Sequence, residues 1–230
     1  MAITLIHGQD HKGSTYNISK TLAEKINGKI DEFFLPKNFN GDCIGCLNCL
    51  KNGIENCPHY DELSLILNSM LSSEVIIIDT PTYCMEMSGQ LKSLFDHLFT
   101  MWLSHRPNEK MFSKIGVAIS TAAGAGMKNV TKSIARQMFY LGIPKVYKIP
   151  FRAAATSWEG VSKKRKAKII RKTNKLAKTI IKIYGKVKAR FKLKFMFSIM
   201  RMMQKGNDYA PLDKKYWEEK GWLKKARPWK

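Results

Sequence analysis

Short apolar runs alternate along the chain with longer stretches in which apolar residues recur every three or four positions. The short runs are rich in β-branched residues and are bounded by Gly, Pro or polar residues, as is typical of strands buried in a parallel sheet. They lie at Ala2–His7, Lys29–Leu35, Val75–Ile78, Ile115–Ser120 and Lys145–Pro150. The pattern therefore predicts five strands.

The stretches between these runs predict amphipathic helices. The first has Ile18, Leu22 and Ile26 on one stripe and is expected to end at Gly28. The others are expected after Asp61-Glu62, over Leu91–Leu103, over Met127–Leu141 and from a cap at Ser162, the last with an apolar stripe from Ile169 to Val187. This alternation of strands and helices predicts an α/β fold with a doubly wound parallel sheet, complete by about residue 190.

Basic residues are concentrated in the second half of the chain. Residues 1–110 hold 9 Lys/Arg and 13 Asp/Glu, whereas residues 111–230 hold 31 and 5. We therefore expect a sheet domain over residues 1–190 and a basic, aromatic extension over residues 191–230. Such an extension attracts nucleic acid, anionic lipid, phosphorylated cofactors or acidic proteins, although a high lysine content also fits an A/T-rich genome. No apolar run is long enough to predict a membrane-spanning helix.

Four of the five cysteines fall within fifteen residues, spaced C-x2-C-x2-C-x7-C, at Cys43, Cys46, Cys49 and Cys57. Thiolates at every third position can curl around one centre while a fourth returns from a short loop, and Gly45 leaves room for that backbone. The spacing suits a [4Fe–4S] cluster or tetrahedral zinc, with metal-free thiols as the plain alternative. Disulfides are disfavoured because the N-terminus does not resemble a signal peptide, so we expect a cytoplasmic protein.

The loop from Gly8 to Thr15 joins the first strand to its helix and is rich in Gly, Ser and Thr. Backbone N–H groups and hydroxyls converge at such a helix N-terminus, so the loop is a candidate phosphate site. It is not a Walker A loop, because Ser14 follows Gly13 where lysine is required, and it is not a dinucleotide fingerprint. The alternative is that Ser14 only caps the helix.

The loop after the third strand, Asp79–Gly89, is expected at the edge of the sheet where ligands bind in open α/β folds. Pro81 would stiffen it and Tyr83 would offer an aromatic face, with a plain surface aromatic as the less favoured alternative for Tyr83. Cys84 stands apart from the other cysteines and is expected to be a small buried filler.

The loop after the fourth strand, Ser120–Gly126, is expected at the same edge and consists of small residues. Its Gly124 and Gly126 match part of a dinucleotide fingerprint, but Asn129 stands where the third small residue belongs. A pair of glycines alone does not indicate that cofactor.

With the cysteines placed between the second strand and its helix, these loops resemble those of the flavodoxin-like NADPH-dependent FMN reductases, and more narrowly the iron–sulfur flavoproteins of anaerobic prokaryotes. The specific parts are the cysteine loop followed by Asp61-Glu62, and Thr80–Tyr83 with Ser88–Lys92. The resemblance covers residues 1 to about 160, with a supporting helix to about 186. It implies a five-stranded parallel sheet in the order 2-1-3-4-5 that binds FMN.

The resemblance also implies site residues by position. The FMN phosphate would be held by the first loop, at Gln9, His11, Gly13, Ser14 and Thr15. The ribityl chain and ring would lie along Pro81, Thr82, Tyr83, Cys84, Met85, Ser88 and Gly89, and the far end of the ring would face Thr121, Ala122, Gly124 and Gly126. Cys43, Cys46, Cys49 and Cys57 would bind a [4Fe–4S] cluster, although their last spacer is long and polar.

The function implied is that of an oxidoreductase in which FMN does the chemistry, so no side chain is named as catalytic. With a cluster, single electrons would pass between a ferredoxin-type partner, the cluster and a flavin that could belong to a neighbouring subunit. Without one, NAD(P)H would reduce FMN directly and a quinone or other small acceptor would reoxidise it. A basic nucleic-acid-binding module is a third hypothesis, disfavoured because no nucleic-acid-binding motif is recognisable.

The aromatic residues of the extension, from Phe191 to Trp229, are expected to pack against a neighbouring subunit of a homo-oligomer. Contact with an anionic membrane surface is the alternative. Among the histidines, His7 and His11 are expected near the phosphate, and His59 and His97 at the surface or at helix caps.

Overall fold

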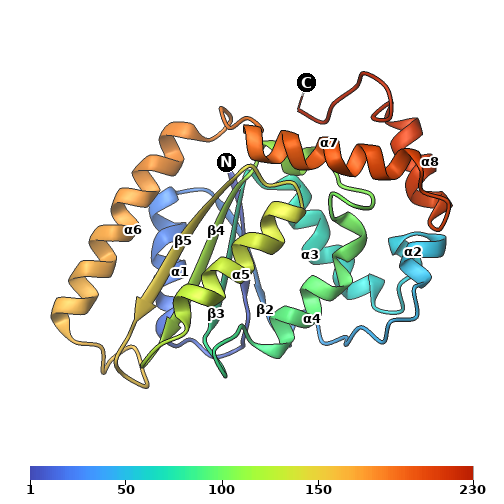
Figure 1. Cartoon of the computed structure of the whole chain (residues 1–230). Coiled ribbons are helices and arrows are strands. Elements are labelled where there is room, and N and C mark those ends of the chain that lie inside the picture. The colour runs from blue at the N-terminus through green and yellow to red at the C-terminus, as the bar shows by residue number, and fades with distance from the viewer. Residues whose placement is uncertain (230) are drawn as a thin grey trace.

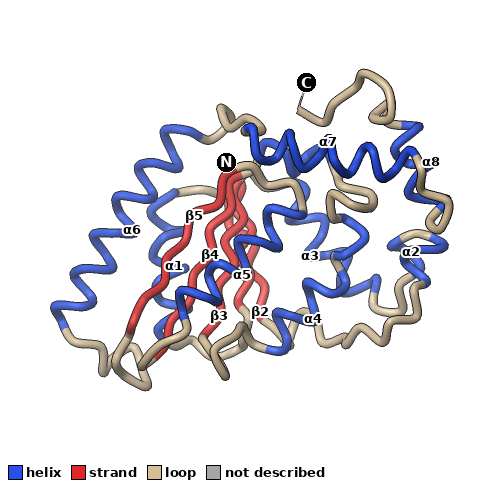
Figure 2. Tube along the Cα trace, viewed as in Figure 1, coloured by secondary structure: helices blue, strands red, loops and turns tan. Residues whose placement is uncertain are grey.

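The computed structural model describes residues 1–229, and its centre is a five-stranded parallel sheet (Figures 1 and 2). The strands are β1 (Ala2–His7), β2 (Lys29–Phe34), β3 (Val75–Pro81), β4 (Ile115–Ala122) and β5 (Lys145–Arg152). Their order is β2-β1-β3-β4-β5, and each neighbouring pair is parallel. The predicted doubly wound sheet is confirmed.

Helices cover both faces of the sheet. On one face lie α1 (Ser14–Ile26) and α6 (Lys163–Ile183); on the other lie α3 (Tyr60–Ser72), α4 (Gly89–His97) and α5 (Met127–Tyr140). Along β3, Val75 and Ile77 face the first group of helices while Ile76 and Ile78 face the second. Because side chains of a strand alternate between its two faces, this continuous apolar strand contributes to two separate cores.

The remaining elements lie outside these layers. The cysteine segment contains α2 (Asn48–Asn52) and a 3-10 turn over Ile54–Asn56, and further 3-10 turns span Phe99–Met101 and Glu109–Ser113; the C-terminal extension contains α7 (Phe191–Lys205) and α8 (Pro211–Glu219). Figure 1 shows α7 at the end of the molecule opposite the carboxyl ends of the strands, and α8 beside α2. Among residues 1–229, no helix combines the length and the apolar character needed to cross a bilayer.

The aromatic residues of the extension pack largely on their own chain. Phe197, Trp217 and Trp222 are buried together with Leu103 and Phe112, which precede β4. These three aromatic side chains are therefore not available to anchor a neighbouring subunit, whereas the oligomeric state itself stays a prediction. The division into residues 1–190 and 191–230 also stays a prediction, and Lys230 lies outside the described residues.

One helix is shorter than its apolar pattern predicts. The helix expected over Leu91–Leu103 ends at His97. Trp102 leaves the helical path to stack on Tyr140, with ring centroids 4.8 Å apart, and Leu103 joins the small core beneath the extension. Tertiary packing therefore overrides the helical period over these residues.

Two other helix ends also depart from the prediction. After α1 the left-handed residue is Asn27 (φ 58°), not Gly28. Gly28 has another role, because a Cβ there would lie 2.6 Å from the carbonyl oxygen of Met1. After α6 the helix stops at Ile183, short of Val187, since Gly185 takes a left-handed conformation with φ 70°.

Candidate functional site

A cleft opens at the carboxyl ends of β1, β3, β4 and β5. It is lined by Gln9, His11, Ser14, Thr15, Pro81, Thr82, Tyr83, Thr121, Ala122, Ala123, Ala153, Ala155 and Thr156. Nine of these were expected from the sequence as cofactor-binding residues, and they lie at the ends of β3 and β4, in the loops after β1 and β3, and at the start of α1. The cleft lies at the strand ends of an open sheet near the point where strand order reverses, which is where such folds bind ligands.

The first loop is held to the second by a chain of side-chain hydrogen bonds. The Tyr83 hydroxyl donates to Oε1 of Gln9 at 2.7 Å, and the Gln9 amide lies 3.0 Å from Nε2 of His11. The amide group of Gln9 donates here, so Nε2 of His11 accepts and the neutral ring carries its proton on Nδ1. Tyr83 is thus a structural partner of the first loop as well as an exposed aromatic face.

The N-terminus of α1 points its free backbone N–H groups at the cleft. Gly13 is the N-cap, and within the described part of the chain no side chain caps this helix or places a carboxylate in its first turn. The alternative that Ser14 caps the helix is therefore wrong. Beneath the cleft, the hydroxyls of Thr15 and Thr121 lie 2.6 Å apart, which ties α1 to the end of β4. Uncapped N–H groups beside two hydroxyl-bearing residues suit a phosphate.

The other predicted cofactor residues do not line the cleft, although Ser88 and Gly126 hold its loops in place. The hydroxyl of Ser88 is buried, donates to the carbonyl of Gly8 and caps α4. Gly126 has φ 93°, and a Cβ there would lie 2.6 Å from Cγ2 of Thr82, so the second and third loops touch through it. Gly124 and Gly89 have open space around them, and Gly89 lines a different cavity.

Cys84 and Met85 form a tight turn at the tip of the second loop. Tyr83 and Glu86 exchange two backbone hydrogen bonds of 2.9 Å around it, and the two central residues have φ of 48° and 69°. Both are exposed, so the expectation that Cys84 is a buried filler is wrong. A two-residue hairpin turn of type I′ requires positive φ at both central positions, and this requirement is local backbone geometry that apolar patterning does not reveal.

The cleft also includes residues that the sequence did not suggest. Ala153, Ala155 and Thr156 follow β5 and close the side of the cleft beyond β4. Their small size and their position directly after a strand are the features of the sequence that could have identified them as part of the cleft. By contrast His7, expected near the phosphate, does not line the cleft and is almost fully buried.

His7 instead forms part of an ion-pair cluster beneath the first loop. Its Nδ1 lies 2.6 Å from Asp79 and its Nε2 lies 3.1 Å from Glu32, which also pairs with Lys20 at 2.9 Å. Burial alone would lower the pKa of His7, but the two carboxylates outweigh burial and raise it above its usual value. The cluster joins β1 to β2 and β3 at the point where the first loop begins.

The four clustered cysteines line a second, separate cavity. Cys43, Cys46, Cys49 and Cys57 face it together with His59 and His97, and none of its residues belongs to the cleft. The predicted tight backbone is present, because Gly45 and Leu47 have φ of 68° and 57°. Burial, and after it the neighbouring thiols of Cys57, Cys43 and Cys46, raise the pKa of the Cys49 thiol. The four cysteines that line this cavity carry thiols, the donor type of a [4Fe–4S] cluster or a zinc site, and the fit is one of donor type.

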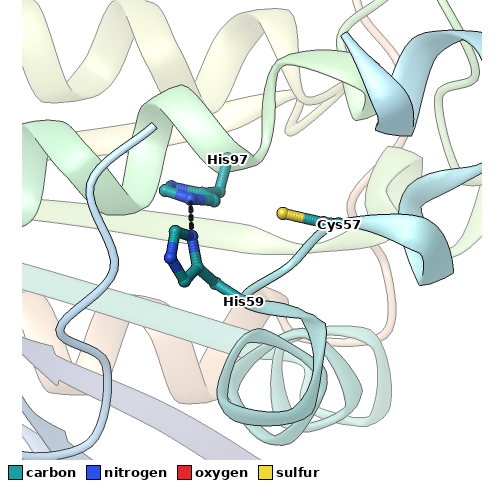
Figure 3. A group of neighbouring side chains, drawn as sticks. All are labelled: Cys57, His59 and His97. Carbon is teal, nitrogen blue, oxygen red and sulfur yellow. Dashed lines mark hydrogen bonds between the residues drawn. The ribbon is translucent and has the colours of Figure 1, made fainter. Parts of the chain in front are cut away.

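Two histidines lie against this cavity. His59 is the N-cap residue of α3, which is one of the places expected for it, whereas His97 departs from the expectation. His97 is buried rather than at the surface, and one ligand atom from each of Cys57, His59 and His97 lies within 4.8 Å of the others (Figure 3). Nδ1 of His97 donates to the carbonyl of Ser93 at 2.8 Å, so its neutral Nε2 accepts from Nδ1 of His59 at 2.9 Å. A metal held by both imidazoles would have to displace that bond.

The cysteine segment is also tied to the C-terminal extension. Arg106 donates through Nη2 to the carbonyl of Cys49 and through Nη1 to the carbonyl of Leu50 at 3.3 Å. The same guanidinium pairs with Asp213 of α8, which is completely buried and also accepts from Nδ1 of His105 at 2.7 Å. One buried carboxylate therefore connects α8 to the backbone of α2.

Comparison with known families agrees with this geometry. The family model described as NADPH-dependent FMN reductase matches residues 1–154. The match ends after β5, so it includes the first three loops of the cleft and the cysteine segment but not α6, α7 or α8.

Several curated relatives have the name iron–sulfur flavoprotein. One from Archaeoglobus fulgidus is 30% identical over 99 residues, which are 42% of this chain and 48% of the relative. One from Clostridioides difficile is 32% identical over 108 residues, or 44% and 47% of the two chains. One from Methanosarcina thermophila is 26% identical over 140 residues, or 58% and 71%. The chain thus spans about half the length of the first two relatives.

Solved structures share the fold at low sequence identity. A flavone reductase aligns with a TM-score of 0.60 at 14% identity, covering 83% of this chain and 66% of that one. An FMN-dependent NADH-azoreductase from Bacillus anthracis, solved in complex with FMN, aligns with a TM-score of 0.55 at 15% identity, covering 77% and 100%. At these identities the likeness concerns the fold alone.

Proposed function

The chain belongs to the NADPH-dependent FMN reductase family, and on that premise we propose that it is an FMN-dependent oxidoreductase whose cleft at the strand ends holds FMN. The observation that carries the proposal is the cleft itself. Loops after four different strands meet there, with hydroxyls and uncapped helix N–H groups at one end and the exposed ring of Tyr83 along one side. This combination suits a molecule that has a phosphate at one end and a flat ring at the other.

Within this proposal each loop has a distinct role. Residues 9–15 bind the phosphate through Ser14, Thr15 and the N-terminus of α1. The loop containing Pro81, Thr82 and Tyr83, with Cys84 and Met85 at its tip, lies along the ribityl chain and one edge of the ring. Thr121, Ala122 and Ala123 face the far end of the ring, and Ala153, Ala155 and Thr156 close the cleft behind it. FMN, when bound, supplies the redox chemistry, taking electrons from NAD(P)H or from a one-electron donor and passing them to an acceptor.

We further propose that Cys43, Cys46, Cys49 and Cys57 hold a [4Fe–4S] cluster. The support is the convergence of the four thiols on one cavity, together with the name shared by the curated relatives. A cluster there would exchange single electrons with a ferredoxin-type partner and with a flavin. Because the cavity and the cleft have no residue in common, a flavin in a neighbouring copy is a candidate partner as well as the one in the same chain.

The test is to purify the full chain without oxygen and to measure FMN, iron and acid-labile sulfide per chain. We expect one FMN with four iron and four sulfide. Iron should fall in Cys43→Ser and stay unchanged in Cys84→Ser, whose thiol lies outside the cavity. One FMN without iron would leave a plain NAD(P)H-dependent reductase with free or zinc-bound thiols. A protein that takes up no FMN would overturn the main proposal.

A sharper test of the phosphate site uses a pair of serine variants. Ser14→Ala removes a hydroxyl from the cleft and should weaken FMN binding by about tenfold, the value of one hydrogen bond to a charged group. Ser64→Ala is the control, because its hydroxyl bonds only within the exposed side of α3. FMN fluorescence quenching measures both. Equal affinities in the two variants would argue against Ser14 as a phosphate ligand.

A further inference from the structure

Helix α7 has an apolar side that faces water as well as one that faces the protein. Leu193, Phe197 and Gln204 are its buried residues. On the opposite side Phe191, Phe195 and Met202 are 83%, 56% and 67% exposed. At 3.6 residues per turn these three positions fall on a single stripe directly opposite the buried one. We call this stripe the outer face of α7.

The outer face is bordered by lysines. On the helix surface Lys192 lies to one side of the stripe, and Lys194 and Lys205 lie to the other, and all three are exposed. The ammonium of Lys192 sits 5.2 Å from the ring of Phe139, and that of Lys194 sits 5.9 Å from the ring of Trp229. The apolar stripe is therefore framed by positive charge on both sides.

The segment of chain that contains α7 carries charge of one sign only. Residues 160–207 contain 17 Lys/Arg and not a single Asp or Glu. The stretch includes all of α6 and α7 and the segment between them. A surface of this kind repels a second copy of itself and attracts an extended anionic surface.

We propose that the outer face of α7 binds the surface of an anionic lipid bilayer, with the helix axis parallel to the membrane plane. Phe191, Phe195 and Met202 enter the boundary between headgroups and acyl chains, and the bordering lysines contact the acidic headgroups. An apolar stripe framed by lysines, on a helix with no acidic residue, is the pattern of interfacial helices. The positive charge beside the outer face is complementary to anionic lipid and repels the same charge on a second copy of the chain.

The placement of α7 is compatible with the rest of the molecule. Figure 1 shows the helix at the end of the sheet away from the strand termini that form the cleft. None of the outer-face residues lines the cleft or the cysteine cavity, so membrane binding leaves both open. The proposal therefore stands independently of FMN or iron binding.

The test is co-sedimentation of the full chain with vesicles of phosphatidylcholine alone and of phosphatidylcholine mixed with phosphatidylserine. We expect binding only to the mixed vesicles, weakening as salt is raised. Phe191→Ser with Phe195→Ser should weaken binding by about a hundredfold, counting about tenfold for each ring. Lys205→Gln should weaken it about fivefold. Leu65→Ser is the matched control, because Leu65 is 63% exposed on α3, and it should change nothing.

Several outcomes would overturn the proposal. The first is a wild-type chain that binds neither vesicle, which needs no variant. The second is a double variant that melts like the wild type and still binds the mixed vesicles as tightly. The third is self-association of the wild type, seen in light scattering as a mass that rises with concentration, together with its loss in the double variant. The outer face would then be a contact between copies of the chain. Loss of DNA binding in the double variant with unchanged vesicle binding would assign the face to nucleic acid instead.

Discussion

Replacement of Asp213 by alanine should destabilise the fold and loosen the cysteine segment at the same time. Asp213 is completely buried in α8 and accepts hydrogen bonds from Arg106 and His105. Arg106 is itself largely buried and donates to the carbonyls of Cys49 and Leu50. Alanine would leave the guanidinium buried without a counter-charge and would remove the link between α8 and α2.

The magnitude follows from the burial of the pair. Breaking a buried ion pair by removing one partner destabilises a protein by about 3–5 kcal/mol, because the remaining charge stays desolvated. Two hydrogen bonds to a charged carboxylate give about the same total. For a chain of this length each kcal/mol shifts Tm by about 2–4 °C, so the melting temperature should fall by about 10 °C.

Thermal melting and hydrogen exchange measure the two halves of this prediction. Asp208→Ala is the matched control, since Asp208 is 92% exposed and its contact with Lys214 is 3.4 Å long, so it should shift Tm hardly at all. In iron-free protein, exchange of the backbone amides in α2 and alkylation of Cys49 should speed up in Asp213→Ala only. Equal Tm values for the two variants would refute the buried-pair argument. A lower Tm with unchanged exchange in α2 would refute the link to the cysteines.

Three further predictions concern other parts of the chain. Gly126→Ala should weaken FMN binding and lower the free energy of unfolding by about 1–2 kcal/mol, because the φ of 93° and the 2.6 Å distance from a Cβ to Thr82 both oppose a side chain there. Gly124→Ala should be neutral, because Gly124 has open space around it. FMN titration and thermal melting compare the two variants. The pKa of His7 is raised in the folded protein, so His7 stabilises the fold fully below its unfolded-state pKa of about 6.5, and this stabilisation is lost as the pH rises through its folded-state pKa. Urea unfolding of the wild type should therefore show a free energy of unfolding that falls by at most about 1.4 kcal/mol per pH unit. His7→Gln should not show this decline. Lys114 has its pKa lowered to about 8 by burial, so the unfolded chain binds more protons above that pH, and stability should rise from about pH 8 to 10 in the wild type but not in Lys114→Met.

The sheet and most of the cleft could be predicted from the sequence because their signals are local. Runs such as Val75–Ile78 are buried on both faces and reveal themselves by continuous apolar character. Parallel strands bring their carboxyl ends to one edge, so the loops containing Ser14, Thr82 and Thr121 had to meet once the alternation of strands and helices was recognised.

The features that were missed depend on contacts between distant residues. His97 was expected at the surface or at a helix cap, but it packs against Phe39 and His59, which lie far earlier in the chain. The end of α4 depends on Trp102 stacking with Tyr140, and the burial of Trp217 depends on a core shared with Leu103. The periodicity of a single segment contains no information about such pairings. The hydrogen bond between Arg106 and Asp213 likewise joins residues 107 positions apart, so only the folded structure reveals it.

The cleft and the cysteine segment make separate sets of long-range contacts. Substitutions that affect one of them should therefore leave the other unchanged. The family match ends at residue 154, yet Asp213 reaches the backbone of the cysteine segment from far beyond that limit. The cleft receives nothing from α7 or α8, and it has no residue in common with the cysteine cavity. Changes at Asp213 should therefore act on the thiols and changes at Gly126 on the cleft. Because distant sites with no shared partners add, the double variant should lose the sum of the two single losses in unfolding free energy. A double variant that departs clearly from that sum would show that the extension also acts on the cleft.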